Sequence, residues 1–296
     1  MKEKPFSKYQ ILANAVMIIW TLAIILPFIL LFMSSITDEN TLVANGYSFF
    51  PKKFSLASYS YIIKSGGQIL KAYGVSIGVT VVGTLLNVLL SALMAYPLSV
   101  KNLPGRNVMM FFVFFTMLFN GGIVPSYIMW TGTFHIKDTI FAQLLPNFLL
   151  SAWNVIMIRT YFTTSIPDGL YEAAEIDGAS QFTIFWKIVL PLGKPILVTM
   201  GTFAGLAYWN DWTNGLYYIV KNTGLYNVQN LLNQMVQNIQ FLTQSSNSNV
   251  TAAASTIPAT GIQMAIAFVA ILPIMLIFPS FQKYYAKGIA LGAVKG

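Results

Sequence analysis

Four of the nine acidic residues in the chain lie close together: Asp168, Glu172, Glu175 and Asp177. Carboxylates gathered in this way can serve acid–base chemistry, or they can meet another protein. The first three are spaced i, i+4 and i+7, so a helix places them along one face. Like charges on one stripe repel each other and need a cation or water beside them. The spacing therefore favours a contact surface over an acid–base pair.

The residues around the carboxylates predict a short helix with a defined start and end. Pro167 suits the first helical position, and Asp168 suits the positive end of the helix dipole. Ala173 and Ala174 are small enough for another backbone to approach closely. Gly178 is expected to end the helix, because glycine accepts the left-handed conformation that closes it.

A second helix is predicted directly after this glycine. Ser180 can cap it, apolar residues recur along 182–189, and Pro191 ends it after Leu190. Pro195 then begins the next apolar segment. The result is a helix-turn-helix with an acidic knob of small residues. A solvated loop is the alternative, although antiparallel helices commonly join in about 2–8 residues.

The composition indicates that this knob belongs to a membrane protein. The 296 residues are 56% hydrophobic and 9% charged, against about 25% charged in a soluble domain. The chain has no cysteine and one histidine, His135, which excludes thiolate chemistry and leaves few ligands for a metal. We expect a single all-α integral membrane domain over residues 1–296.

Six segments have the roughly 20 mainly apolar residues that are needed to cross a hydrocarbon core of about 30 Å. These segments are 12–34, 72–97, 108–130, 139–162, 195–220 and 259–281. The first follows a basic start but is too long for a signal peptide and has no cleavage site, so we expect a retained helix. Apolar residues at helical spacing over 231–239 predict an amphipathic helix outside the membrane, with a loop as the alternative.

Six spans place both termini on one side of the membrane, and the basic residues indicate which side. Eleven Lys and Arg residues lie in the tails and in the 2–3 and 4–5 connections, and six lie opposite. The termini and the acidic knob are therefore predicted to be cytoplasmic. The net charge of +8 follows this distribution and forms no basic stripe, so no nucleic acid partner is expected.

The knob resembles the EAA loop of ABC importer permeases. The resemblance rests on Glu172-Ala173-Ala174, Asp177-Gly178-Ala179 and the following Ile188, Leu190-Pro191 and Pro195, and on a position two spans before the C-terminus. In that family the loop is a cytoplasmic coupling helix, which inserts into a groove on the ATP-hydrolysing subunit. The resemblance implies that the ATPase is contacted by this set: Asp168, Glu172, Ala173, Ala174, Glu175, Asp177, Gly178 and Ala179.

Three shorter motifs resemble the carbohydrate-importing branch related to the maltose permease: Asn120–Pro125, Trp209–Asp211 and the tail Lys287–Gly296. The first and last look most like permeases for oligosaccharides or polysaccharide fragments. The resemblance implies a transport subunit, not an enzyme, in the plasma membrane of a bacterium. The implied partners are a second homologous permease, two copies of an ATPase subunit that binds ATP and Mg, and an extracytoplasmic sugar-binding protein.

Polar residues within the spans are candidates for the translocation path, because polar groups are costly in a membrane and usually face protein or water. Amides, a carboxylate and flat aromatic rings suit the hydroxyls and C–H faces of sugars. The candidates are Asn120, Asn147, Tyr208, Trp209, Asn210, Asp211 and Asn214. An aromatic belt with helix–helix hydrogen bonds is the alternative for each. Gly121-Gly122 and Pro125 are expected to interrupt the third span.

The main alternative function is an ion-coupled secondary sugar carrier. Such a carrier would usually have paired intramembrane charges and structural repeats, and Asp211 alone is thin support. A membrane enzyme would need a nucleophile, a metal site or an acid–base pair. Residues 65–68 resemble an ABC ATPase signature, but the chain has no G-x-x-x-x-G-K-[ST] loop for the phosphates. We expect no cofactor and no metal in this chain.

Overall fold

The computed structural model describes residues 8–64, 66–244 and 259–293. The chain divides into two units, one formed by Met1–Ile69 with Leu232–Pro273 and the other by Leu70–Leu231 with Ile274–Gly296. In the described residues every regular element is a helix, apart from one isolated β-bridge between Thr37 and Phe54. The all-α prediction is confirmed. The polar segment 245–258 and the last three residues of the tail motif lie outside the described residues.

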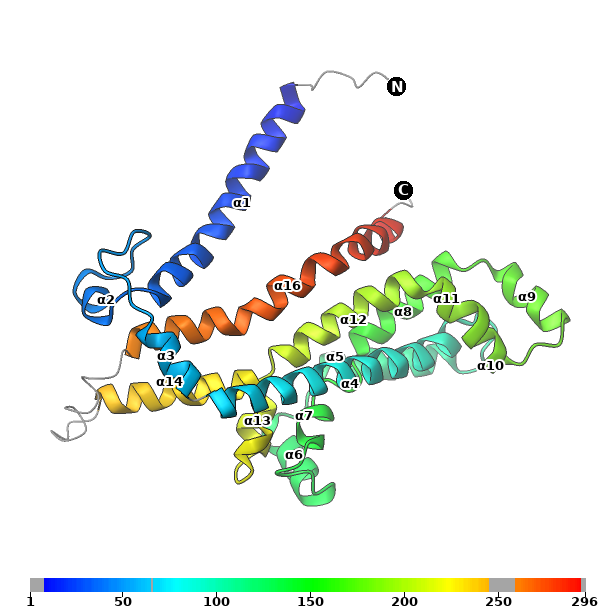
Figure 1. Ribbon diagram of the computed structural model, residues 1–296. Coiled ribbons are helices and arrows are strands. Elements are labelled where there is room, and N and C mark those ends of the chain that lie inside the picture. The colour runs from blue at the N-terminus through cyan, green and yellow to red at the C-terminus, as the bar shows by residue number, and fades with distance from the viewer. Residues whose placement is uncertain (1–7, 65, 245–258, 294–296) are drawn as a thin grey trace. The chain divides into compact units, whose positions relative to one another are not determined.

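The first unit contains α1 (Lys8–Ser35), α2 (Glu39–Asn45) and α3 (Ala57–Lys64), with parts of α14 (Val228–Gln244) and α16 (Ala259–Ala293) (Figure 1). The end of α1 packs against its neighbours through two contacts. The Ser35 hydroxyl lies 2.8 Å from the Tyr59 hydroxyl, and the rings of Phe32 and Phe268 lie 4.9 Å apart. The helix predicted within 231–239 is confirmed as part of α14.

One carboxylate holds the start of the last long helix. The two oxygens of Glu39 accept hydrogen bonds from the amides of Thr260 and Gly261 at 2.9 and 2.8 Å. A negative charge is favourable there, because it satisfies free amides and faces the positive end of the α16 dipole. Position 261 has no room for a larger residue, because a Cβ there would lie 2.5 Å from the Ser58 hydroxyl.

The second unit consists of shorter helices arranged around α4 (Figure 1). Its elements are α4 (Gly66–Ser99), α5 (Arg106–Leu118), α6 (Ile123–Ile128), the π-helix η1 (Met129–Thr133), α7 (Phe141–Leu144), α8 (Ala152–Ser165), α9 (Asp168–Ile176), α10 (Gln181–Ile184), the π-helix η2 (Phe185–Val189), α11 (Leu190–Leu192), α12 (Lys194–Trp209), α13 (Thr213–Tyr218) and the 3₁₀-helix η3 (Thr223–Leu225).

Three described helices are long and apolar enough to cross a membrane: Tyr9–Ser35, Gly66–Ser99 and Thr260–Ile277. Two further candidates are bent pairs of helices. Arg106–Leu118 with Ile123–Thr133 is bent by 109°, and Gln181–Leu192 with Lys194–Trp209 is bent by 78°. The interruption predicted at Gly121-Gly122 is therefore confirmed, whereas Pro125 lies within α6 and does not interrupt the helix.

The predicted fourth and fifth spans are not continuous helices. Residues 139–162 form α7 and α8 with an irregular segment, 145–151, between them. Pro146 has no amide hydrogen to continue a helix, and Asn147 adopts a left-handed φ of 67°. Residues 195–220 form α12 and α13 with a break after Trp209.

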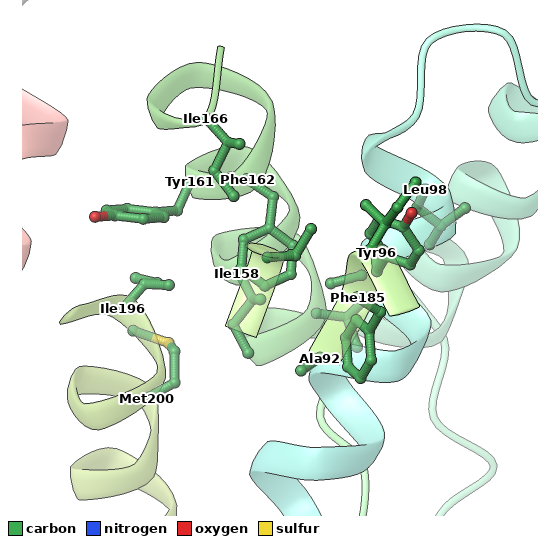
Figure 2. Close-up of a cluster of buried hydrophobic side chains, with 14 of the residues drawn as sticks. Ala92, Tyr96, Leu98, Ile158, Tyr161, Phe162, Ile166, Phe185, Ile196 and Met200 are labelled. Atoms are coloured by element: carbon green, nitrogen blue, oxygen red, sulfur yellow. The ribbon is translucent and has the colours of Figure 1, made fainter. Parts of the chain in front are cut away.

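The core of the second unit lies between α4, α8, η2 and α12 (Figure 2). Ile158 and Phe162 on α8 face Ile196 and Met200 on one side. On the other side lie α4 and η2, where the rings of Tyr96 and Phe185 are 5.4 Å apart. The side chains that fill this core are the fully buried ones expected of close-packed helices.

The helix predicted to stop at Leu190 continues to Leu192. Along its length it changes from an α-helix to a π-helix and back to an α-helix. A π-helix, η2, precedes Pro191, whose ring would clash with the carbonyl four residues earlier in an α-helix. The chain bends at Gly193, where a Cβ would lie 2.5 Å from the Phe162 ring and 2.9 Å from the Val189 carbonyl oxygen.

Small residues bring α4 and α12 together. Gly201 and Gly205 form a G-x-x-x-G pattern on α12, and a Cβ at either would meet Thr84 at 3.8 and 3.3 Å. A glycine of α4 has the same role, because the Tyr208 ring of α12 lies over Gly83. Such small-residue contacts let backbones approach where water provides no hydrophobic driving force.

We predict that Gly83→Ala destabilises the second unit by about 1–3 kcal/mol, the usual cost of overpacking. The added Cβ would lie 2.5 Å from the Tyr208 ring, which is held in place by its hydrogen bond to the Leu144 carbonyl oxygen. Thermal unfolding of the purified protein in lipid nanodiscs measures this. Gly78→Ala on the same helix is the control, since a Cβ there meets nothing within 4 Å. Equal stability of the two variants would contradict the packing argument.

Candidate functional site

The acidic knob forms a closed and well-defined turn. Helix α9 begins at Asp168, with Pro167 at the N-cap and not at the first helical position as predicted. At its end the Gly178 amide bonds to the Glu175 carbonyl oxygen and the Ala179 amide to that of Ala174. These two bonds form a Schellman motif, and Gly178 has the left-handed φ of 75° that this motif requires. The predicted role of Gly178 in ending the helix is confirmed.

The predicted coupling residues do not all point outward. Asp168, Glu172, Ala173, Glu175, Asp177 and Gly178 are exposed, whereas Ala174 is buried in the core cluster and Ala179 is half-buried against it. Two apolar side chains stand beside the exposed residues, Ile176 at 86% and Phe182 at 68% exposure. The knob therefore offers a mixed acidic and apolar surface.

Contacts from α4 hold the knob in place (Figure 1). Lys101, just beyond α4, forms an ion pair with Asp168 and supplies the cation that the carboxylate stripe needs. The Tyr96 hydroxyl donates to the Gln181 side chain at 2.5 Å, and Gln181 donates to Glu175 at 2.8 Å. Sequence reasoning missed these partners, which lie far from the knob in the chain.

Tyr171 packs on the side of α9 that faces the core. Its ring stacks on Tyr96 with centroids 6.4 Å apart, and burial raises the pKa of its hydroxyl. Tyr171 therefore stays neutral at physiological pH and serves as a packing residue. Ser180 caps α10 by accepting a hydrogen bond from the Thr183 amide at 3.2 Å, as predicted. The carboxylates of the knob thus have structural contacts on one side and solvent on the other.

Among the predicted path residues of the fifth span, only Asn210 is exposed. Tyr208 and Trp209 are buried at the end of α12, and the Tyr208 hydroxyl donates to the Leu144 carbonyl oxygen at 2.9 Å. Asp211 is also buried, and one of its oxygens accepts from the Thr213 amide and hydroxyl and from the Asn214 amide. This oxygen therefore caps free amides at the start of α13, where Trp212 is the N-cap residue. The other oxygen of Asp211, Oδ2, is buried without a hydrogen-bond partner among the described residues.

The structure brings Asn147 and Asn214 together although they are 67 residues apart in the chain. Asn147 donates to the Asn214 side-chain oxygen at 3.2 Å, and Asn214 donates to the Pro146 carbonyl oxygen at 3.1 Å. Asn214 is fully buried and Asn147 is exposed. This pair ties the break between α7 and α8 to the start of α13.

Sequence reasoning missed several buried amides that complete this arrangement. Next to α8, Asn154 donates to Asn87 and Asn87 donates to the Phe148 carbonyl oxygen, both at 2.7 Å. Next to α13, Asn227 and Asn230 donate to the Asp211 and Trp212 carbonyl oxygens. Asn87 and Asn154 interrupt apolar runs, so a search for amides within the predicted spans could have found them.

Asn120 lies apart from this network, at the break between α5 and α6. Its side-chain oxygen accepts from the Gly122 amide at 2.8 Å, and Gly122 has a left-handed φ of 85°. Residues 119–122 are all exposed. The predicted path residues thus form two groups, one held by internal hydrogen bonds and one open to its surroundings.

An exposed carboxylate joins two connections at the other end of this unit. Asp138 accepts from the amides of Val220, Lys221 and Asn222 at 2.7, 2.7 and 3.1 Å, and these backbone donors lower its pKa. Its neighbour Lys137 bonds to the Tyr127 hydroxyl at 3.1 Å. We call the Asp138 contact with residues 220–222 the outer latch.

A metal centre has no basis in the described part of the chain, where no three His, Asp or Glu side chains converge. His135 is exposed and has a left-handed φ of 51°. The geometry instead contains a solvent-exposed acidic knob, a set of broken apolar helices and the outer latch.

The family profile described as "Binding-protein-dependent transport system inner membrane component" matches residues 72–291. The chain belongs to this family, and the predicted class, a permease subunit of an importer, is confirmed. It is a transport component of the inner membrane and not an enzyme.

Two relatives from Bacillus subtilis (strain 168) are similar over most of their length. Protein LplC is 37% identical over 272 residues, which cover 92% of this chain and 90% of the relative. The polygalacturonan/rhamnogalacturonan transport system permease protein YtcP is 36% identical over 288 residues, which cover 97% of this chain and 98% of the relative.

A solved structure is similar as well. It is the crystal structure of a bacterial ABC transporter involved in the import of the acidic polysaccharide alginate. One of its chains matches with a TM-score of 0.78 and 26% identity, over 95% of this chain and 100% of that chain. The importer fold is therefore shared over nearly the whole molecule.

We predict that the outer latch weakens in acid. Because folding lowers the pKa of Asp138, its charge favours the latch at neutral pH, and this contribution is lost as the pH falls below the ordinary value of 3.8 through the lowered pKa. Hydrogen exchange of the amides of residues 220–222, corrected for intrinsic rates, measures it. Asp138→Ala should lose the protection already at neutral pH and show no further acid step. Full protection in that variant would contradict the latch.

Proposed function

We propose that this chain is the permease subunit of an ATP-driven, binding-protein-dependent importer that carries an oligosaccharide into the cell. The observation that carries this proposal is the knob at α9, exposed toward solvent and anchored to α4 and the core behind it. Family membership supports transport. The names of YtcP and of the alginate importer support a carbohydrate as the cargo.

The proposed topology is one permease domain with six spans and both termini in the cytoplasm. The spans are α1, α4, α5 with α6–η1, α7 with α8, α12 with α13, and α16. The surplus of basic residues on the side of the termini supports this orientation. It places α9 on the cytoplasmic side, where ATP is available.

The proposed partners are a second permease, two ATPase subunits and an extracytoplasmic sugar-binding protein. Glu172, Ala173 and Gly178, with Asp168, Glu175 and Asp177 around them, would enter a groove on the ATPase. Ile176 and Phe182 supply apolar area next to them. Ala174 and Ala179 would support this contact indirectly, because they pack α9 onto the core. ATP and Mg would bind the ATPase subunits.

Movement of the ATPase would reach the membrane along two connections. The Lys101–Asp168 ion pair and the Tyr96–Gln181–Glu175 hydrogen bonds link the knob to α4. The helix from α10 through η2 and α11 links it to α12 across the bend at Gly193. Displacement of α9 would therefore move two spans together. This movement would open the path alternately to the two sides of the membrane.

The proposed path includes the exposed polar residues Asn120, Asn147 and Asn210. Four other predicted residues are buried and are proposed to support the residues that line the path: Tyr208, Trp209, Asp211 and Asn214. Asn210 directly precedes the α13 cap at Asp211, so the cap orients the exposed amide.

We predict ATP-driven uptake in proteoliposomes that hold the complete importer with its binding protein outside. Labelled tetragalacturonate and neutral maltotetraose are suitable probes, because they separate acidic from neutral cargo. Uptake should require ATP inside the vesicle and persist without any ion gradient. Uptake that follows a proton or sodium gradient without ATP would instead establish the secondary carrier, and transport of neither probe would remove the carbohydrate assignment.

We predict that Gly178→Asn lowers ATPase association and uptake about tenfold or more. Asn tolerates the left-handed conformation, so the turn survives, while the added side chain fills space that a docking partner needs. Co-purification of the ATPase with the tagged permease measures association. The matched control is Gly169→Asn, the same substitution at an exposed helical glycine of α9. Normal association in the Gly178 variant would refute the docking assignment.

A further inference from the structure

Three spans of the second unit break at a similar distance from their cytoplasmic ends. Helices α5, α8 and α12 have 13, 14 and 16 residues, or about 20–24 Å at about 1.5 Å per residue. This is less than the roughly 30 Å of the hydrocarbon core. Each break therefore leaves irregular backbone inside the membrane, where free amides and carbonyls are costly.

Two of these breaks receive hydrogen bonds from side chains elsewhere in the chain. Between α7 and α8, the carbonyl oxygens of Leu144, Pro146 and Phe148 accept hydrogen bonds from side chains on α12, α13 and α4. After α12, the carbonyl oxygens of Asp211 and Trp212 accept from the side chains of Asn227, just before α14, and of Asn230 on α14. Side chains of this chain therefore satisfy carbonyl oxygens at both breaks.

The break between α5 and α6 has no such partners. Among the described residues, the amides of Asn120 and Gly121 and the carbonyls from Phe119 to Gly121 have no hydrogen-bond partner. All of these residues are exposed. Irregular backbone at this depth is tolerated only against protein or in a water-filled cavity. The break must therefore face a path or another molecule.

Aromatic rings lead directly to this break. Phe111, Phe115 and Phe119 are spaced four residues apart on α5, with ring centroids 6.0 and 4.3 Å apart, and the last two are stacked. All three are exposed. The opposite face of α5 buries Val113 in the core cluster, so the rings are not needed for packing in this chain. The exposed ring next to the break, Phe119, can pack on the C–H face of a sugar.

We propose that this break is a sugar-binding element of the path. The exposed Phe119 ring packs on a sugar face, while the Asn120 side chain and the amides of Asn120 and Gly121 donate to hydroxyls and ring oxygens. The Asn120 Oδ1 is already engaged with Gly122, which leaves its NH₂ group free to donate. The segment 107–130 carries no charged side chain, so the element recognises the neutral parts of the sugar. It rests on the oligosaccharide import proposed above.

Uptake kinetics in the reconstituted importer test this element with the probe that the wild-type protein transports. Phe119→Leu removes the ring but keeps an apolar side chain, and it should raise KM about fivefold or more, the loss expected for one ring contact. Phe119→Trp should keep a KM near that of the wild type. Phe114→Leu is the matched control, because Phe114 is an exposed ring on the same helix that does not belong to the row of Phe111, Phe115 and Phe119.

The possible outcomes separate the element from the importer function. If the wild-type importer transports neither probe, the carbohydrate import itself fails. If the wild type transports a probe and Phe119→Leu has an unchanged KM, the sugar-binding element is refuted. It is also refuted if Phe119→Leu loses the second permease during purification, because the rings then form a subunit interface. A raised KM with intact assembly and rescue by Phe119→Trp supports it.

Discussion

A backbone amide or carbonyl without a partner costs several kcal/mol in hydrocarbon, and this constraint explains the placement of most polar side chains in the second unit. Continuous helices meet the constraint without help. Broken helices do not, and the chain supplies amides from distant segments to receive the freed groups. Asn87, for example, reaches the Phe148 carbonyl oxygen from a position 61 residues earlier in the chain. The breaks at 145–151 and after Trp209 thus depend on amide side chains from distant segments, whereas the break between α5 and α6 has none among the described residues.

The acidic knob, for which we propose a coupling role, is held by local and by tertiary contacts. A Schellman turn closes α9, so its shape does not depend on a partner. The Lys101–Asp168 pair is exposed and contributes little stability by itself, but it restricts the direction in which α9 can move. Half-buried Tyr171 and buried Ala174 pack α9 onto the core. In the proposed coupling, this packing would let a movement of α9 displace α4 and α12 together.

Local features of the structure could be predicted from the sequence, whereas tertiary partners could not. The limits of α9, the end at Gly178, the Ser180 cap and the interruption at residues 121–122 all follow from residues within a few positions of each feature. The π-helix before Pro191 and the break at 145–151 do not. Hydropathy counts side chains over a window and is insensitive to backbone donors that come from 60 or more residues away. Pro146 was the one local sign that the fourth span would not be continuous.

Candidate path residues divide according to how their hydrogen bonds are used. A buried Asn214 that already bonds to Pro146 and Asn147 has little capacity left for a passing ligand. Exposed donors at Asn120 and Gly121 have that capacity, and they lie where irregular backbone must meet water or a solute. A transporter needs contacts that form and break with each cycle. Groups fixed by the fold cannot provide them, whereas the exposed break at Asn120 and Gly121 has donors from which binding energy for a moving substrate can arise.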